Sequence, residues 1–123
     1  MKPRLKVLII EDDESIAEAI GMALTFDGFE IKVVIQATQA ISAVKTYKPD
    51  AIVLDLLLSG IDGRDIAKAL KNNTKTKNIP IILTSAHPLA EKAAQAAGAD
   101  AFIAKPFDIS VLSDKIKTLT ALR

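Results

Sequence analysis

The sequence contains no cysteine, and its only histidine is His87. Without cysteine the chain can form no disulfide, no zinc–thiolate site and no thiol nucleophile, and a single histidine cannot build a metal site from several imidazoles. Long hydrophobic runs are missing as well, since none approaches the roughly 20 residues that a membrane-spanning helix needs. The opening MKPRLKVLII has too short an apolar run for a signal peptide and leads straight into three acidic residues. We therefore expect a cytoplasmic protein that does not contact membranes.

An excess of charge of one sign is also lacking. The 123 residues include 16 lysines and arginines and 15 aspartates and glutamates, which gives a net charge of +1. Such a balance provides no field that would attract nucleic acid or an anionic membrane. Apolar residues make up 50% of the chain, which is enough to bury a core, and no linker, repeat or low-complexity segment divides it. We expect one domain that extends over residues 1–123.

Short apolar runs alternate with longer stretches in which apolar residues recur at helical spacing. The runs occupy residues 5–10, 31–35, 51–54, 81–83 and 101–104. Most are apolar at consecutive positions, which is typical of strands covered on both faces in a parallel sheet. Between them, stripes such as Ile16, Ile20 and Leu24 predict amphipathic helices. This alternation predicts a flavodoxin-like (βα)5 fold of the α/β class, a doubly wound parallel five-stranded sheet with strand order 2-1-3-4-5.

Chemically active side chains stand where four of these runs end. They are Glu11, Asp12 and Asp13 after the first run, Asp55 after the third, Thr84 and Ser85 after the fourth, and Lys105 after the fifth. In a doubly wound sheet the carboxyl ends of the strands line the binding crevice. The sequence therefore predicts that carboxylates, a hydroxyl and an amine lie close together in this protein.

The chemistry of that group is specific. Two carboxylates roughly 4 Å apart repel each other by about 4 kcal/mol at an effective dielectric constant of about 20, so such a cluster needs cations. Lys105 supplies one positive charge, and a hard divalent ion with oxygen ligands, Mg²⁺ above all, is the natural second. A magnesium ion, an ammonium group and a hydroxyl around a carboxylate are the components of phosphoryl transfer, in which aspartate can be the nucleophile.

The residues around these strand ends form four motifs: VLIIEDDESI, DAIVLDLLLSGIDG, IPIILTSA and GADAFIAKPFD. With the motifs in this order and at these separations, the sequence resembles the CheY-like receiver domain of bacterial two-component response regulators over essentially its whole length. The resemblance implies a phosphorylation-dependent signalling switch, in which Asp55 accepts a phosphoryl group from a sensor histidine kinase or a histidine phosphotransfer protein. It implies no enzyme activity beyond the phosphorylation and dephosphorylation of Asp55 itself.

The resemblance also implies a role for each residue of the site. Asp12 and Asp55 would bind Mg²⁺ directly, together with the backbone carbonyl of Leu57, and Glu11 would hold the ion through water. Lys105 would pair with Asp55 first and with the phosphoryl group afterwards.

Further implied features concern the switch and its output. Ser85 would be the hydroxyl that moves in to bond a phosphoryl oxygen, and Phe102 would be the aromatic residue that moves inward with it. The Lys105–Pro106 peptide bond would be cis, although only about 5% of X–Pro bonds are.

The output surface would comprise the fourth helix, the fifth strand and the fifth helix, where a downstream protein or a second copy binds. On that surface we expect Lys92, Gln95, Phe102 and Lys117.

Simpler interpretations stay open for several residues. Asp13 is predicted to start the helix that follows it rather than to take part in the site, with Asp13 or Ser15 near the cap. Thr84 is an alternative to Ser85 as the switch hydroxyl, and Phe102 can equally be a core aromatic. Ser59 stands where the family often has proline, and this substitution is expected to loosen the loop after Asp55.

Other classes of function compete with the switch. An Mg²⁺-dependent aspartyl phosphatase usually carries a second acid two residues after its nucleophile, where this chain has Leu57. A flavin carrier would need a hydroxyl-rich or glycine-rich loop after the first strand, but the acids found there would repel a phosphate. A pseudo-receiver that only docks onto a partner is the remaining alternative, and the complete set of acids, hydroxyl and lysine disfavours it. A stand-alone receiver and a segment of a longer protein are both compatible with the sequence.

Overall fold

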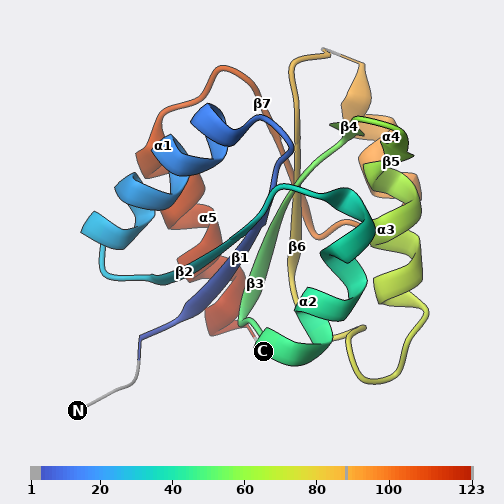
Figure 1. Ribbon diagram of the computed structural model, residues 1–123, viewed down its shortest axis with the longest axis horizontal. Helices are drawn as coiled ribbons and strands as arrows, with labels where there is room; N and C mark the ends of the chain where they lie inside the picture. Colours follow the sequence, from blue (N-terminus) through green and yellow to red (C-terminus); the bar gives the residue numbers. More distant parts are fainter. Residues whose placement is uncertain (1–3, 88, 123) are drawn as a thin grey trace.

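The computed structural model describes residues 4–87 and 89–122. Its main sheet has five parallel strands in the order β2-β1-β3-β6-β7 (Figure 1), so the predicted flavodoxin-like fold and strand order are confirmed. The strands of this sheet are β1 (Lys6–Ile10), β2 (Glu30–Val34), β3 (Ala51–Asp55), β6 (Ile81–Ser85) and β7 (Ala101–Ala104). The α-helices are α1 (Glu14–Phe26), α2 (Ala40–Tyr47), α3 (Gly63–Lys71), α4 (Ala90–Ala96) and α5 (Ile109–Ala121), and a 3₁₀ helix, η1 (Ala37–Gln39), precedes α2.

Helices cover the sheet on both faces. Helices α1 and α5 pack on one face, and α2, α3 and α4 pack on the other (Figure 1). The central strands β3 and β6 are buried at every residue, which explains their consecutive apolar positions. Because successive side chains of a strand point to opposite faces, Leu54 contributes to the core beneath α3, whereas Val53 contributes to the core beneath α5. In the described part of the chain, no helix combines the length and the apolar composition needed to cross a membrane.

Helix α1 buries most of the stripe that the sequence predicts, since Leu24 lies in the core and Ile20 packs, partly buried, against it. Ala17, Gly21 and Leu24 face the core, while Ile16 is 40% exposed. A Cβ atom at Gly21 would touch the side chain of Ile31 on β2 at 3.5 Å. This is an ordinary van der Waals distance, and the buried face of α1 is centred on Ala17, Gly21 and Leu24, with Ile16 at its edge.

A small hairpin follows β3 and is not anticipated by the sequence. Strands β4 (Leu57–Leu58) and β5 (Ile61–Asp62) pair in antiparallel fashion and are joined by a two-residue turn, Ser59 and Gly60. Gly60 has a φ of 76°, a left-handed conformation that glycine adopts without steric cost. Strands of two residues are too short to produce a periodic pattern, so only the turn glycine signals the hairpin in the sequence.

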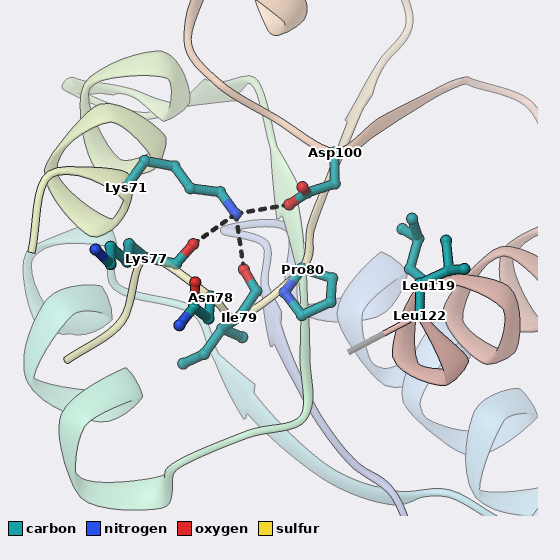
Figure 2. Close-up of a pocket in the computed structure, with 8 residues that line it drawn as sticks. All are labelled: Lys71, Lys77, Asn78, Ile79, Pro80, Asp100, Leu119 and Leu122. Atoms are coloured by element: carbon teal, nitrogen blue, oxygen red, sulfur yellow. Dashed lines mark hydrogen bonds and ion pairs between the residues drawn. The ribbon is translucent and has the colours of Figure 1, made fainter. Parts of the chain in front are cut away.

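Lys71 connects three segments at the amino end of the sheet. Its Nζ donates hydrogen bonds to Asp100 Oδ2 at 2.7 Å and to the carbonyl oxygens of Lys77 at 3.1 Å and Ile79 at 3.0 Å (Figure 2). Asp100 also accepts the backbone N–H of Ile81, the first residue of β6, at 2.8 Å. These bonds fix the loop before β6 and the residue before β7, and they lie at the opposite end of the strands from the acidic residues.

Candidate functional site

Asp55 is the last residue of β3, which occupies the centre of the main sheet. The residue is only 9% exposed, and it pairs in register with Thr84 on β6. Leu56 donates its backbone N–H to the carbonyl of Thr84 at 2.9 Å, which extends the ladder by one residue. The sheet therefore fixes the backbone of Asp55 and presents its carboxylate where the strand ends.

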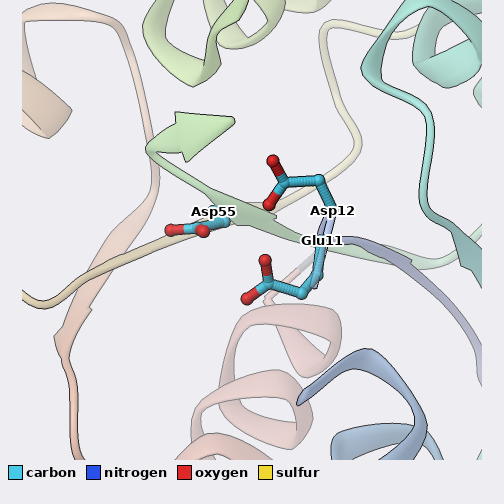
Figure 3. A group of neighbouring side chains, drawn as sticks. All are labelled: Glu11, Asp12 and Asp55. Atoms are coloured by element: carbon cyan, nitrogen blue, oxygen red, sulfur yellow. The ribbon is translucent and has the colours of Figure 1, made fainter. Parts of the chain in front are cut away.

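Glu11 and Asp12 follow β1, which runs parallel to β3 as its neighbour. Because Ile10 is paired with Leu54, the next residue of each strand brings Glu11 beside Asp55. One oxygen from each of the three carboxylates lies within 4.8 Å of the others, and Figure 3 shows them gathered at this end of the sheet. The structure thus places together three acids that are up to 44 positions apart in the chain.

Of the two candidates that the sequence offers, Asp13 rather than Ser15 caps helix α1. Its Oδ1 accepts a hydrogen bond from the backbone N–H of Ile16 at 3.1 Å. The N–H of Asp13 in turn donates to Glu11 Oε2 at 3.2 Å. The cap therefore also orients one of the carboxylates of the site.

Lys105 follows β7 and supplies a cation to the acidic cluster. Its Nζ donates to Glu11 Oε1 at 2.7 Å and lies 3.5 Å from Asp55 Oδ2. The resemblance implies a pair with Asp55, whereas Glu11 is the nearer partner in this structure. The backbone N–H of Lys105 donates to the carbonyl of Ser85 at 2.8 Å, and the Lys105–Pro106 peptide bond is cis. A single ammonium group thus faces two carboxylates.

Burial and neighbouring charges set the protonation of this pair. Burial raises the pKa of Glu11 and the charge of Asp55 adds to the rise, although hydrogen bonds from Lys105 and from the Asp13 N–H oppose it. Burial alone would lower the pKa of Lys105, but its hydrogen bond to Glu11 and the charges of Asp55 and Glu11 outweigh burial, so the pKa is raised. Lys105 therefore stays charged at neutral pH, and it balances only part of the negative charge of three carboxylates.

Asp12 is bonded to the hairpin that follows β3. The backbone N–H of Ser59 donates to Asp12 Oδ2 at 2.7 Å. Hydrogen bonds from the side chain and the backbone of Ser59 hold the pKa of Asp12 below its usual range. The sequence analysis did not predict this contact. Serine in place of the family's proline at position 59 could have indicated it, because proline has no N–H to donate.

The donor set fits a hard divalent cation. Mg²⁺ binds carboxylate oxygens at about 2.1 Å, so oxygens on opposite sides of the ion lie roughly 4.2 Å apart. The three oxygens of the cluster fall within 4.8 Å of one another. These distances are compatible with direct binding by Asp12 and Asp55 and with a water between the ion and Glu11. Leu57, whose carbonyl is the implied fourth ligand, lies on β4 with a side chain that is 66% exposed.

Two hydroxyl residues end strand β6, and both are buried. They point to opposite faces of the sheet because side chains alternate along a strand. Ser85 Oγ accepts the backbone N–H of His87 at 3.0 Å, whereas Thr84 is the register partner of Asp55. The Ser85 hydroxyl is thus bonded to the loop after β6, and a switch role requires it to reorient. The assignment of the switch hydroxyl to Ser85 rather than Thr84 stays a prediction.

Phe102 lies on β7 and packs, half-buried, against the core beneath α4. It borders a surface depression together with Gln95 of α4 and Lys115 of α5. Lys117 was expected on the same surface, but this placement is wrong, because its Nζ lies over the ring of Phe29, 5.8 Å from the ring centre. Residues two apart in a helix point about 200° apart, so Lys115 is the α5 lysine on the Phe102 side.

Replacing Lys105 with methionine is expected to lower the free energy of unfolding by about 1–3 kcal/mol at neutral pH, because the buried Glu11 carboxylate loses its cation. A carboxyl group whose pKa is raised by folding stabilises the protein below its ordinary pKa, and that stabilisation is lost as the pH rises through the raised value. Since Lys105 lowers the pKa of Glu11, its removal raises this pKa further. The loss of stability should therefore grow as the pH increases above 4.5, the ordinary pKa of the group.

Urea unfolding followed by circular dichroism, from about pH 4 to about pH 8, measures this difference. Lys115→Met, at an exposed lysine of α5, is the matched control and should leave the stability nearly unchanged. A Lys105→Met variant as stable as the wild type over the whole range would show that the pair with Glu11 contributes nothing.

Residues 7–117 match the family of response regulator receiver domains. The DNA-binding response regulator MtrA of Mycobacterium tuberculosis is 32% identical over 116 residues, which are 93% of this chain and 50% of MtrA. The response regulator MprA of Mycobacterium avium is 27% identical over 117 residues, which are 94% of this chain and 50% of MprA. The chain therefore spans about half the length of the curated relatives it matches.

Solved structures of response regulators also match this chain over nearly its whole length. A putative response regulator from Chloroflexus aurantiacus is 30% identical, with a TM-score of 0.91 over 97% of this chain and 99% of that chain. The response regulator TrrA from Thermotoga maritima, solved in complex with Mg²⁺ and BeF, is 26% identical, with a TM-score of 0.84 over 94% of this chain and 98% of that chain. The matched region contains the whole acidic cluster and Lys105. The chain belongs to the response regulator receiver domains of two-component signalling, a family of CheY-like domains that are not conventional enzymes.

Proposed function

We propose that this chain is a phosphorylation-dependent signalling switch whose phosphoacceptor is Asp55. The observation that carries the proposal is a largely buried Asp55 carboxylate, 3.5 Å from Lys105 Nζ and grouped with Glu11 and Asp12. An oxygen of Asp55 attacks the phosphorus of a phosphohistidine. The bond between phosphorus and the histidine nitrogen then breaks, and its electron pair returns to the imidazole, which takes up a proton from solvent.

The contacts of the three carboxylates favour Asp55 over its neighbours as the nucleophile. Glu11 Oε1 accepts a hydrogen bond from Lys105 at 2.7 Å, and Asp12 Oδ2 accepts one from Ser59 at 2.7 Å. The contact of Asp55 with Lys105 is longer, at 3.5 Å, so its oxygens are the more available for attack. From the same position, the ammonium group of Lys105 can stabilise negative charge on the transferred phosphoryl oxygens.

A bound Mg²⁺ would neutralise the phosphoryl oxygens during transfer. We propose that Asp12, Asp55 and the backbone carbonyl of Leu57 hold it directly and that Glu11 holds it through water. The complex of TrrA with Mg²⁺ and BeF supports a magnesium site in a relative of the same fold.

Receiver domains accept phosphoryl groups from histidine kinases. For this chain we propose a sensor histidine kinase or a histidine phosphotransfer protein as the donor, with residues 1–123 acting in the cytoplasm as one receiver domain. Phosphorylation would draw the Ser85 hydroxyl away from the His87 N–H, and Phe102 would move inward. The surface of α4, β7 and α5 would then bind a downstream protein or a second copy, without direct contact to nucleic acid or membranes.

Incubation of the purified protein with acetyl phosphate and Mg²⁺, followed by intact-mass spectrometry, tests this function. We expect the mass of one phosphoryl group to appear only with Mg²⁺ and to be removed by hydroxylamine, which cleaves acyl phosphates. Beryllofluoride with Mg²⁺ should shift the backbone amide resonances around Asp55. Failure of both reagents would favour a pseudo-receiver that docks without modification, and turnover of phosphomonoesters would favour an aspartyl phosphatase.

A further inference from the structure

We propose that the backbone N–H of Ser59 positions Asp12 for the divalent cation, which makes the hairpin of residues 57–62 part of the metal site. The inference rests on the magnesium site of the proposed function. Ser59 lies in the turn of the hairpin, and its N–H donates to Asp12 Oδ2 at 2.7 Å across 47 residues of sequence. This is a short hydrogen bond to a charged acceptor, a class that is stronger and more directional than neutral hydrogen bonds.

The hydrogen bond engages Oδ2 of Asp12, and a carboxylate has enough lone pairs to accept it and bind an ion at the same time. Figure 3 shows the two oxygens of Asp12 diverging, with one directed toward Glu11 and Asp55. Asp12 follows the end of β1 and is only partly buried, so the surrounding core does not restrict its side chain by itself. The Ser59 N–H therefore supplies an orientation that packing does not. Carboxylates that bind metals are commonly oriented by such outer hydrogen bonds.

The turn itself accepts either serine or proline at position 59. Ser59 has a negative φ and Gly60 a φ of 76°, which is the pattern of signs in a type II turn. Proline is common at the first central position of that turn, so its fixed φ fits there. Toward Asp12, serine offers two groups that proline lacks: the backbone N–H, which donates to Oδ2, and the side-chain hydroxyl. The departure from the family's proline therefore adds a hydrogen-bond donor that reaches a metal ligand.

A consequence is that the contact of the hairpin with Asp12 and the binding of the cation are coupled. The same carboxylate takes part in both, so an ion that fixes Asp12 strengthens the contact with Ser59. By thermodynamic reciprocity, a docked hairpin strengthens the binding of the ion to the same degree.

The test compares Ser59→Pro with Ser59→Ala, since alanine removes only the hydroxyl and keeps the backbone N–H. Titration of each protein with Mg²⁺, followed by amide NMR, gives the dissociation constant without any phosphoryl transfer. We expect Ser59→Pro, which lacks both the hydroxyl and the N–H, to bind Mg²⁺ on the order of tenfold more weakly than Ser59→Ala, which lacks only the hydroxyl. Equal affinity in Ser59→Pro and Ser59→Ala would overturn this inference alone. A wild type in which Mg²⁺ moves no resonance near Asp12 and Asp55 would overturn the magnesium site as well.

A second measurement does not depend on how the proline variant folds. The amide of Ser59 belongs to an exposed residue, and its hydrogen bond to Asp12 should slow its exchange with solvent in the wild type. In Asp12→Ala this amide should exchange at least about tenfold faster, while the buried amide of Val53 on β3 stays protected. Equal exchange rates of the Ser59 amide in the two proteins would show that the contact does not hold in solution.

Discussion

Asp55→Asn is expected to abolish phosphoryl incorporation from acetyl phosphate in the presence of Mg²⁺. The amide has no negatively charged oxygen to attack phosphorus, and it removes one of three clustered carboxylates that would hold the ion. Asparagine has nearly the shape of aspartate, and the backbone of residue 55 is held by the ladder between β3 and β6. The fold should therefore persist, and intact-mass spectrometry should find no phosphorylated protein.

The matched control is Asp65→Asn, at an exposed acid in the first turn of α3, which should incorporate the phosphoryl group like the wild type. The neighbouring acids make the experiment informative, because Asp12 and Glu11 each place an oxygen within 4.8 Å of an oxygen of Asp55. Full incorporation in Asp55→Asn would show that another residue is the phosphoacceptor, and mapping of the modified peptide would identify that residue.

Gly63→Ala is expected to reduce the free energy of unfolding by about 2–3 kcal/mol, since no alternative rotamer can relieve a clash at Cβ. Gly63 begins α3, and its N–H donates to the carbonyl of Leu56 at 2.8 Å. A Cβ atom at this position would press against the backbone oxygen of Asp55 and approach Leu56 Cα at 2.9 Å. The methyl group therefore forces α3 away from the end of β3, and phosphoryl incorporation at Asp55 should fall together with stability.

Urea unfolding followed by circular dichroism measures the effect, and Gly21→Ala provides the contrast. Gly21 lies inside α1, where a Cβ atom would have its nearest neighbour at an ordinary 3.5 Å, and alanine favours a helix by about 1 kcal/mol relative to glycine. Gly21→Ala should thus be neutral or stabilising. A Gly63→Ala protein with the stability of the wild type would show that α3 does not approach the backbone of β3 so closely.

The sequence predicted the site well wherever a residue's place follows from its position on a strand. Glu11, Asp12, Asp55 and Lys105 come directly after apolar runs, and parallel strands deliver such residues to one end of the sheet. The residues of α1 were predicted less well. Helical spacing selected Ile16, Ile20 and Leu24; Leu24 lies in the core and Ile20 packs against it, but Ala17 and Gly21 are buried beside Leu24 and Ile16 is 40% exposed.

The sequence by itself determined where the five strands of the main sheet lie along the chain and which acids follow them, because runs of consecutive apolar residues and the residues that follow them are local properties. The order of the strands in the sheet was adopted from the common flavodoxin-like arrangement, and the structure agrees with it. Tertiary structure decided which of these groups touch. Lys105 lies nearer to Glu11 than to Asp55, and Asp12 accepts a hydrogen bond from Ser59 in a hairpin too short to be seen in the sequence. Which partner a side chain contacts depends on differences of about an ångström in the distances between segments far apart in the chain. Only the packing of the whole sheet and its helices sets those distances.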